Sequence, residues 1–265
     1  MLAQTHYSAE RPNHQPPLLI VHGLFGSARN WSVIARHLAL SRDVIAVDMR
    51  NHGQSPRNTS HSYPDMASDL AEVITAAGGP MDVLGHSMGG KAAMMLALTA
   101  PVLIRRLIVA DIAPVAYTHD NTRHVDAMLA LPLDGLTARS EADRRLAQTV
   151  PDPALRAFFL QSLDLKSTPP AWRLNLRVLA DQMPLIVGWP NVTGSFPQAT
   201  LFLSGGKSQY VLPEHRPIIR NLFPKARFAK LPEAGHWLHA ESPRAFEETV
   251  EVFLTAHSMP SQTIP

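Results

Sequence analysis

Ser87 lies in a sequence pattern that could make it a nucleophile. The pattern is within residues 83–94, VLGHSMGGKAAM. Gly85, Ser87 and Gly89 have the spacing G-x-S-x-G, which places a serine on a sharp turn from a strand to a helix with its hydroxyl exposed. Glycines relieve the crowding at such a turn, and the N-terminus of the following helix favours developing negative charge. Because an apolar run precedes Ser87 and a small-residue helical pattern follows it, the sequence predicts that Ser87 is a nucleophile.

A serine hydroxyl needs a base to become reactive, and His236 is the predicted base. It lies in the late segment EAGHWLHAESP, where the usual chain order of serine, acid and histidine places the histidine. His239 in the same segment is the alternative candidate for the base. The chain has 13 histidines, and a single histidine is more often a surface residue than a catalytic one. Gly235 favours His236, because a glycine lets the loop turn sharply towards the serine.

The acid that orients the histidine is predicted to be Asp111. The first position to search is the segment just beyond the strand residues 199–203, but residues 204–209 read SGGKSQ and hold no carboxylate. The next acid, Glu214, is expected to begin a helix. Asp111 ends an apolar run within LIVADIAP, one strand earlier. A carboxylate there keeps the chain order serine, acid, histidine and could reach the same imidazole. The alternative role for Asp111 is that of a helix cap or turn residue.

An oxyanion formed at Ser87 needs backbone donors. We expect one from the N–H of Met88, directly after the serine, and the other from the N–H of Leu24 in the loop HGLFGS at residues 22–27. That loop has no G-x-G-x-x-G pattern for a dinucleotide, and the later segment SGGKS has Leu201 where a phosphate loop requires glycine.

Apolar runs alternate with helical patterns and so predict the elements that position these residues. Strands are expected at residues 18–23, 43–49, 81–85, 106–114 and 199–206, and helices at 31–40, 63–77, 89–99 and 243–257. Such alternation is typical of βαβ units around a parallel sheet covered on both faces. The predicted fold class is therefore α/β, with a mostly parallel, doubly wound sheet.

The pattern changes after Asp111. From residue 115 to residue 197 there is no convincing strand, and several short helical segments are separated by proline-containing turns. We therefore expect a core made of residues 1–114 and 198–265, with residues 115–197 inserted as a helical cap, or lid, after the strand that carries Asp111.

Most of the chain resembles a known family. The segments HGLFGSARNW, VDMRNHGQSP, GHSMGGKAAM, ADIAPV, WRLNL, IVGW and AGHWLHAE are similar to those of the α/β-hydrolases, and more closely to those of the small bacterial YbfF-type esterases. The resemblance implies hydrolysis of carboxylic esters, or of acyl-CoA thioesters, under a helical cap. It also supports an early acid at Asp111. Residues 117–168 match least well, and these residues are expected to shape the acyl pocket.

Aromatic residues of the cap are predicted to line an apolar acyl pocket over Ser87, since ligand sites favour such walls. The expected wall residues of the cap are Phe158, Phe159, Trp172 and Trp189, and Phe25 of the core is expected to bind the substrate beside them. Arg173 has two interpretations: an ion pair that fixes the cap, which we favour, or contact with a negatively charged substrate such as a CoA phosphate.

Composition limits the partners. Lys and Arg number 24 against 22 Asp and Glu, so the formal charge is only +2 and no basic run suggests nucleic acid. The absence of cysteine excludes disulfides and thiolate sites. No segment has the length of a signal peptide core or of a membrane span. We expect a cytoplasmic protein with a small-molecule ester or thioester substrate and neither cofactor nor metal; the sequence leaves the oligomeric state open.

Other functions on the same scaffold stay open at this point. A cofactor-free haloperoxidase or a C–C bond hydrolase can share the serine triad, and a non-catalytic ligand receptor can share the fold. Dehalogenases and epoxide hydrolases use an aspartate nucleophile, so Ser87 argues against both.

Overall fold

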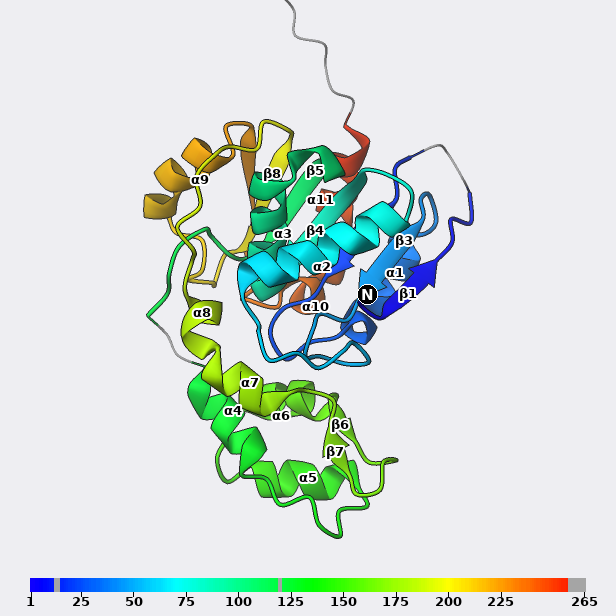
Figure 1. Cartoon of the computed structure of the whole chain (residues 1–265), viewed down its shortest axis with the longest axis vertical. Coiled ribbons are helices and arrows are strands. Elements are labelled where there is room, and N and C mark those ends of the chain that lie inside the picture. The colour runs from blue at the N-terminus through cyan, green and yellow to red at the C-terminus, as the bar shows by residue number, and fades with distance from the viewer. Residues whose placement is uncertain (12–14, 119–120, 257–265) are drawn as a thin grey trace, which may run out of the picture.

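The computed structural model describes residues 1–11, 15–118 and 121–256 (Figure 1). Four parts of the expected organisation fall outside these residues. They are residues 12–14 of the expected core, positions 119–120 of the expected cap, the last position of the helix expected at 243–257, and residues 257–265 of the expected core.

The described part of the chain contains a seven-stranded sheet in the order β1-β3-β2-β4-β5-β8-β9. The strands are β1 (Gln4–Tyr7), β2 (Leu18–Val21), β3 (Val44–Val47), β4 (Met81–His86), β5 (Ile104–Ala110), β8 (Thr200–Gly205) and β9 (Ala226–Leu231). Only the edge strand β1 runs antiparallel to its neighbour, β3. The predicted fold class, a mostly parallel α/β sheet, is confirmed.

Helices cover both faces of this sheet (Figure 1). The core helices are α1 (Ser32–Leu38), α2 (Tyr63–Ala76), α3 (Met88–Thr99), α9 (Arg216–Leu222), α10 (Leu238–Glu241) and α11 (Pro243–Thr255), with the 3-10 turns η1 (Ala28–Trp31), η2 (Pro101–Leu103) and η3 (Pro213–His215). In β2, Leu19 and Val21 pack into the layer that holds α2 and α3, whereas Leu18 and Ile20 pack into the layer that holds α1 and α11. Because successive strand side chains point to opposite faces, a strand buried on both sides is apolar throughout.

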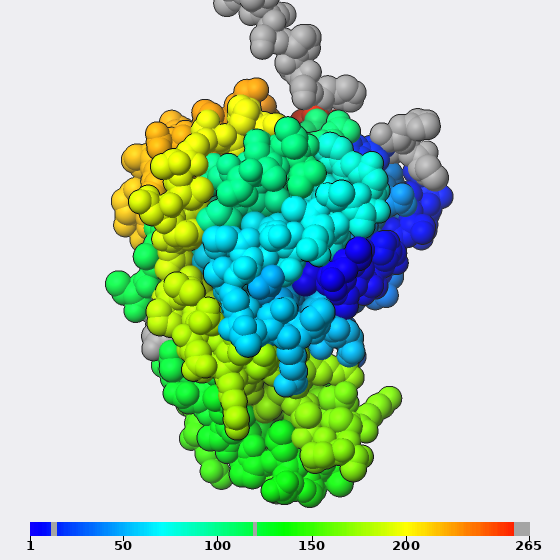
Figure 2. All heavy atoms as spheres, in the orientation of Figure 1, coloured from blue at the N-terminus to red at the C-terminus, as the bar shows by residue number. Residues whose placement is uncertain are grey.

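The segment between β5 and β8 contains the expected run of short helices. These are α4 (Thr122–Leu129), α5 (Arg139–Leu146), α6 (Pro153–Leu160), α7 (Leu176–Asp181) and α8 (Met183–Val187). In Figures 1 and 2 the segment forms a green and yellow-green lobe below the sheet. It also holds two antiparallel strands, β6 (Leu163–Asp164) and β7 (Ala171–Trp172). Sequence analysis missed both, because two residues are too few to show an alternating pattern.

Helix α6 shows how local chemistry sets a boundary in this lobe. The carboxylate of Asp152 accepts hydrogen bonds from the N–H groups of Ala154 (2.8 Å) and Leu155 (3.3 Å). Pro153 occupies the first helical turn, where its missing N–H costs no hydrogen bond. The helix therefore begins at a fixed residue and turns Leu155, Phe158 and Phe159 towards a cavity in front of Ser87.

Within the three described ranges, we find no helix with the length and apolar character needed to cross a membrane.

Candidate active site

Ser87 occupies the turn between β4 and α3. Its backbone has φ 52° and ψ −120°, a conformation that residues other than glycine rarely adopt. The strand fixes the residue on one side and the helix fixes it on the other, since the Lys91 N–H already donates to the Ser87 carbonyl oxygen at 3.0 Å. The strained turn lifts the hydroxyl out of the sheet, as sequence analysis expects of this motif.

The glycines of the pentapeptide are required by close approach of the backbone. A Cβ atom at Gly85 would lie 2.4 Å from the carbonyl oxygen of Gly89, and one at Gly89 would lie 2.4 Å from that of His22. Gly23, in the loop opposite, comes close to the serine itself, because a Cβ atom there would lie 3.1 Å from Ser87 Cβ. These contacts bring β4, α3 and the 22–27 loop together at one point.

The structure brings the three residues predicted for catalysis into one chain of hydrogen bonds. His236 Nε2 lies 3.0 Å from Ser87 Oγ, and His236 Nδ1 lies 2.8 Å from Asp111 Oδ2. A carboxylate can only accept, so Nδ1 carries the proton and Nε2 is left as the acceptor for the serine hydroxyl. The imidazole is therefore oriented as a base for Ser87.

Asp111 is fully buried and directly follows β5. Its backbone also has a positive φ, 53°, and its N–H donates to the Leu203 carbonyl at 2.9 Å. The N–H of Gly205 donates to Oδ1 at 3.0 Å, and the hydroxyl of Ser208 donates to Oδ2. The 204–209 loop, which lacks a carboxylate of its own, thus supplies donors to Asp111. Sequence analysis assigned no role to Ser208, and only its position across the loop reveals one.

The two alternatives to these residues lie elsewhere. His239 stacks on the indole of Trp31, with ring centroids 4.1 Å apart and planes at 13°, and burial lowers the pKa of His239 to about 3. Glu214 is exposed in the 3-10 turn η3. The geometry therefore favours His236 over His239 and Asp111 over Glu214.

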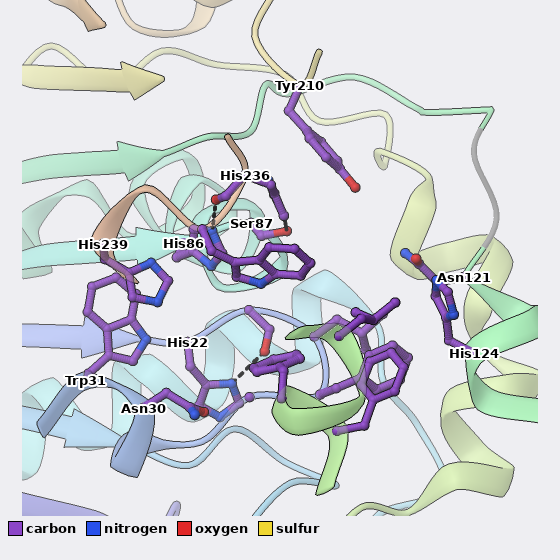
Figure 3. Close-up of a pocket in the computed structure, with 18 of the residues that line it drawn as sticks. His22, Asn30, Trp31, His86, Ser87, Asn121, His124, Tyr210, His236 and His239 are labelled. Atoms are coloured by element: carbon purple, nitrogen blue, oxygen red, sulfur yellow. Dashed lines mark hydrogen bonds between the residues drawn. The ribbon is translucent and has the colours of Figure 1, made fainter. Parts of the chain in front are cut away.

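His86, which precedes the serine, supports the histidine loop. Its Nε2 donates to the backbone carbonyl of His236 at 2.9 Å (Figure 3). Burial holds the pKa of His86 well below its usual range, and His236 and His239 lower it further. On the other side, the ring of Tyr210 stacks on His236 with centroids 4.0 Å apart. Sequence analysis assigned no role to His86 or Tyr210, because only the fold places them beside His236.

The two predicted oxyanion donors flank Ser87. The N–H groups of Leu24 and Met88 have no hydrogen-bond acceptor among the residues that the structure describes, and Met88 begins α3, where N–H groups have no partner within the helix. The next N–H, that of Phe25, is already used, because it donates to His52 Nε2 at 3.1 Å. Phe25 has φ 65°, which turns the loop after Leu24.

Buried histidines hold this loop in place. His22 Nδ1 lies 2.8 Å from the Gly23 carbonyl, and its Nε2 accepts from the Met49 N–H at 2.9 Å. His52 similarly lies 2.9 Å from the Arg50 carbonyl through its Nδ1. Burial is the main cause that lowers the pKa of His22 to about 4 and that of His52 to about 3. Both rings therefore stay neutral, with one nitrogen donating and the other accepting.

A cavity of about 380 Å³ opens in front of Ser87 (Figure 3). The core contributes Leu24, Phe25, Trp31, Tyr210 and Trp237 to its wall, and the segment between β5 and β8 contributes Asn121, Arg123, His124, Leu155, Phe158 and Phe159. In Figure 3, Asn121 and His124 lie across the cavity from His236 and Ser87. The predicted residues Phe25, Phe158 and Phe159 thus lie at the cavity.

The structure corrects the prediction for Trp172 and Trp189, which do not belong to this wall. Trp172 is buried inside the lobe, and its indole Nε1 donates to the Met128 carbonyl at 2.9 Å. Trp189 lies next to Tyr63, with ring centroids 6.1 Å apart. An indole ring carries a donor that must be satisfied on burial, and the Met128 carbonyl inside the lobe meets this need for Trp172.

Arg173, for which substrate contact is the less favoured interpretation, is also placed away from the cavity. Its guanidinium pairs with the Asp164 carboxylate at 2.9 Å, across the β6–β7 pair. This is the ion pair that we favoured for Arg173 over contact with a phosphate. Its side chain borders a separate polar groove with Gln54 and Gln161.

Known proteins resemble this chain over most of its length. Residues 16–243 match the family model described as alpha/beta hydrolase fold. The esterase YbfF of Escherichia coli (strain K12) is 38% identical over 93% of this chain and 96% of its own. The sn-1-specific diacylglycerol lipase ABHD11 of Mus musculus is 39% identical over 90% of this chain and 81% of its own. A solved structure of a marine microorganism esterase superposes with a TM-score of 0.89 at 32% identity, covering 95% of this chain and 98% of that one.

These matches agree with the fold and confirm the resemblance seen in the sequence. The chain therefore belongs to the α/β-hydrolase fold family, and the bacterial esterase YbfF is one of the relatives of this chain.

Proposed function

We propose that this protein hydrolyses carboxylic esters, or the corresponding thioesters, through an acyl-enzyme on Ser87. The observation that carries the proposal is the imidazole of His236, whose two nitrogens hydrogen-bond to Ser87 Oγ and to the buried Asp111 carboxylate. The relatives named as esterase and diacylglycerol lipase support the same class of reaction.

In the first half of the reaction, Ser87 Oγ attacks the carbonyl carbon while His236 Nε2 takes the hydroxyl proton. The carbonyl oxygen becomes an oxyanion that accepts from the N–H groups of Leu24 and Met88. Asp111 stabilises the imidazolium through its bond to Nδ1. The C–O or C–S bond then breaks, and His236 returns the proton to the leaving alcohol or thiol.

In the second half, water attacks the acyl carbon and His236 takes a proton from it. The tetrahedral intermediate collapses, the bond to Ser87 Oγ breaks, and the serine regains its proton as the carboxylic acid leaves. Residues 115–197 would act as a cap in both halves, since α4 and α6 contribute to the wall that faces Ser87. A cavity of about 380 Å³ with aromatic walls suits a small or medium-sized apolar acyl group.

Replacing Ser87 tests the proposal. Ser87→Ala removes the nucleophile and should lower kcat for 4-nitrophenyl butyrate by roughly 10⁴- to 10⁶-fold, as in other serine triads. The far-ultraviolet circular dichroism should stay unchanged, because the substitution removes only a hydroxyl that borders the cavity and makes no capping bond to α3. Labelling by a fluorophosphonate should occur in the wild type and vanish in the variant. Hydrolysis within tenfold of the wild type in Ser87→Ala would sink the proposal, and a wild type that resists the label would indicate a receptor.

A further inference from the structure

Lys91 is a buried cation to which the proposed reaction gives no role. It lies in α3, one helical turn after Ser87, and its residue is only 1% exposed. Its Nζ donates to the carbonyl oxygens of Val187 at 3.0 Å and Gly188 at 2.5 Å, at the end of α8. No carboxylate of the described ranges forms an ion pair with it. An unpaired buried charge is costly to keep, so a lysine here calls for an explanation.

The two connections between the core and the lobe meet at Lys91. The outgoing connection is the end of α8, which Lys91 holds. The ingoing connection passes through Tyr117, whose N–H donates to the same Val187 carbonyl at 3.0 Å. The ring of Tyr117 also lies 4.8 Å from Lys91 Nζ, within range of a cation–π contact. The ammonium group of Lys91 therefore contacts both connections of the lobe, and it does so from α3, the helix that begins directly after Ser87.

A short series of contacts leads from this point to the histidine. The hydroxyl of Tyr117 donates to the backbone carbonyl of Tyr210 at 2.6 Å. The ring of Tyr210 stacks on His236 with centroids 4.0 Å apart and planes at 20°. A space of about 30 Å³ is bordered by Lys91, Tyr117, Tyr210 and Ser87. A shift of the two connections would therefore move Tyr210 and, through it, the imidazole of His236.

We propose that Lys91 is a positioning residue, which holds both connections of the lobe over α3. It thereby keeps Tyr117 in place, and through Tyr117 it keeps Tyr210 stacked on His236. The proposal deepens the esterase function above and rests on it for its kinetic consequence. Its structural consequence, the tie between Lys91 and the connections, is independent of any activity.

The surroundings of Lys91 agree with a role of this kind. Burial lowers the pKa of its ammonium to about 7. The titratable groups that face it are the tyrosines Tyr63 on α2, Tyr117 and Tyr210, and burial raises the pKa of all three above the usual value. They stay neutral near neutral pH, so the backbone carbonyls and the aromatic rings are what stabilise the charge.

Lys91→Met is the main test, because methionine has a similar length and apolar stem but no N–H donors. Hydrogen–deuterium exchange should become faster in peptides that cover residues 113–118 and 184–189, whereas peptides from α5 and α6 should keep their protection. The kcat/KM for 4-nitrophenyl butyrate should fall roughly tenfold to hundredfold, the range expected when hydrogen bonds from a charged group are lost. The loss should lie mainly in kcat, because His236 is displaced while the acyl wall is not.

Two further variants complete the experiment. Lys225→Met changes an exposed lysine and should alter neither exchange nor kinetics. Lys91→Gln keeps N–H donors without the charge; it should recover part of the protection and of kcat, and it serves as the test if Lys91→Met does not fold. Unchanged exchange at both connections in a folded Lys91 variant overturns the proposal, as does faster exchange with unaltered kcat. A wild type without esterase activity but with the exchange effect would instead refute the proposed function alone.

Discussion

In the core, the residues proposed for catalysis come from the ends of parallel strands or the loops after them. In the lobe between β5 and β8, which we propose as a cap segment (residues 115–197), the cavity wall comes mainly from the sides of short helices. Ser87 follows β4 and Asp111 follows β5 directly, and both have positive φ values, 52° and 53°. Phe158 of α6 reaches the cavity, while Trp172 of β7 turns into the interior of the segment.

This difference has a physical origin. Parallel strands in one sheet bring their carboxyl ends to a common edge, so residues that follow them meet whatever their distance in sequence. The register places His86 beside Ala110, and therefore Ser87 beside Asp111. The cap segment has no sheet to align its residues. Which face of each short helix is buried there depends on packing against other parts of the segment.

The largest effect should come from the core, at His236. His236→Ala removes the base and should lower kcat by roughly 10⁵- to 10⁶-fold, as for the histidine of other serine triads. His239→Ala should stay within about tenfold of the wild type, because that ring stacks on Trp31 and lies outside the chain of bonds to Ser87. Steady-state hydrolysis of 4-nitrophenyl butyrate measures both variants. The reverse ranking would show that the wrong histidine was chosen.

The next effect should be at Asp111. Asp111→Asn should lower kcat on the order of 10⁴-fold, because an amide favours the wrong imidazole tautomer. Ser208→Ala removes only one donor to the carboxylate, and its loss should be about tenfold, the worth of one hydrogen bond to a charged group. Glu214→Gln is the control and should resemble the wild type. If Asp111→Asn retained the wild-type kcat, another acid would have to orient His236.

A smaller effect should separate two aromatic residues of the cap segment. Each acyl methylene buried is worth about 0.8 kcal/mol, so Phe158→Ala should lower kcat/KM for hexanoate relative to acetate esters by roughly three- to tenfold, with little change in stability. Trp172→Ala should instead destabilise the fold by about 3 kcal/mol through the cavity it leaves. A series of 4-nitrophenyl esters and thermal unfolding measure the two effects. Equal chain-length profiles in Phe158→Ala and the wild type would remove α6 from the acyl pocket.

The smallest effect should be a pH dependence of stability at Lys91. Burial lowers the pKa of this ammonium from 10.5 to about 7 in the folded chain. Between these pH values the unfolded chain binds more protons than the folded chain, because burial disfavours the charged form of Lys91. The stability that the uncharged side chain provides is therefore fully present above pH 10.5 and is lost as the pH falls through about 7. Lys91→Met lacks this dependence. The Tm of Lys91→Met minus that of the wild type should therefore be more positive, by a few degrees, at pH 6 than at pH 10. A constant difference would contradict the lowered pKa.

The sequence by itself determined the elbow at Ser87, because the demands on Gly85 and Gly89 come from backbone atoms a few residues away or in the adjacent strand. It also indicated Asp111, since the loop where a carboxylate is commonly found holds none, and His236, since a glycine precedes it. Alternating apolar runs predicted the parallel sheet, which the fold and the relatives confirm.

Only the tertiary structure decided which side chains complete the site and line its cavity. Ser208 and His86 act through partners that the sequence does not place beside them, and an aromatic residue in the cap segment looks the same in sequence whether it faces substrate or the interior. For Trp172, the Met128 carbonyl satisfies the indole N–H inside the lobe. For Lys91, the meeting of two chain connections above α3 is created by contacts between segments nearly one hundred residues apart, and no local pattern records it.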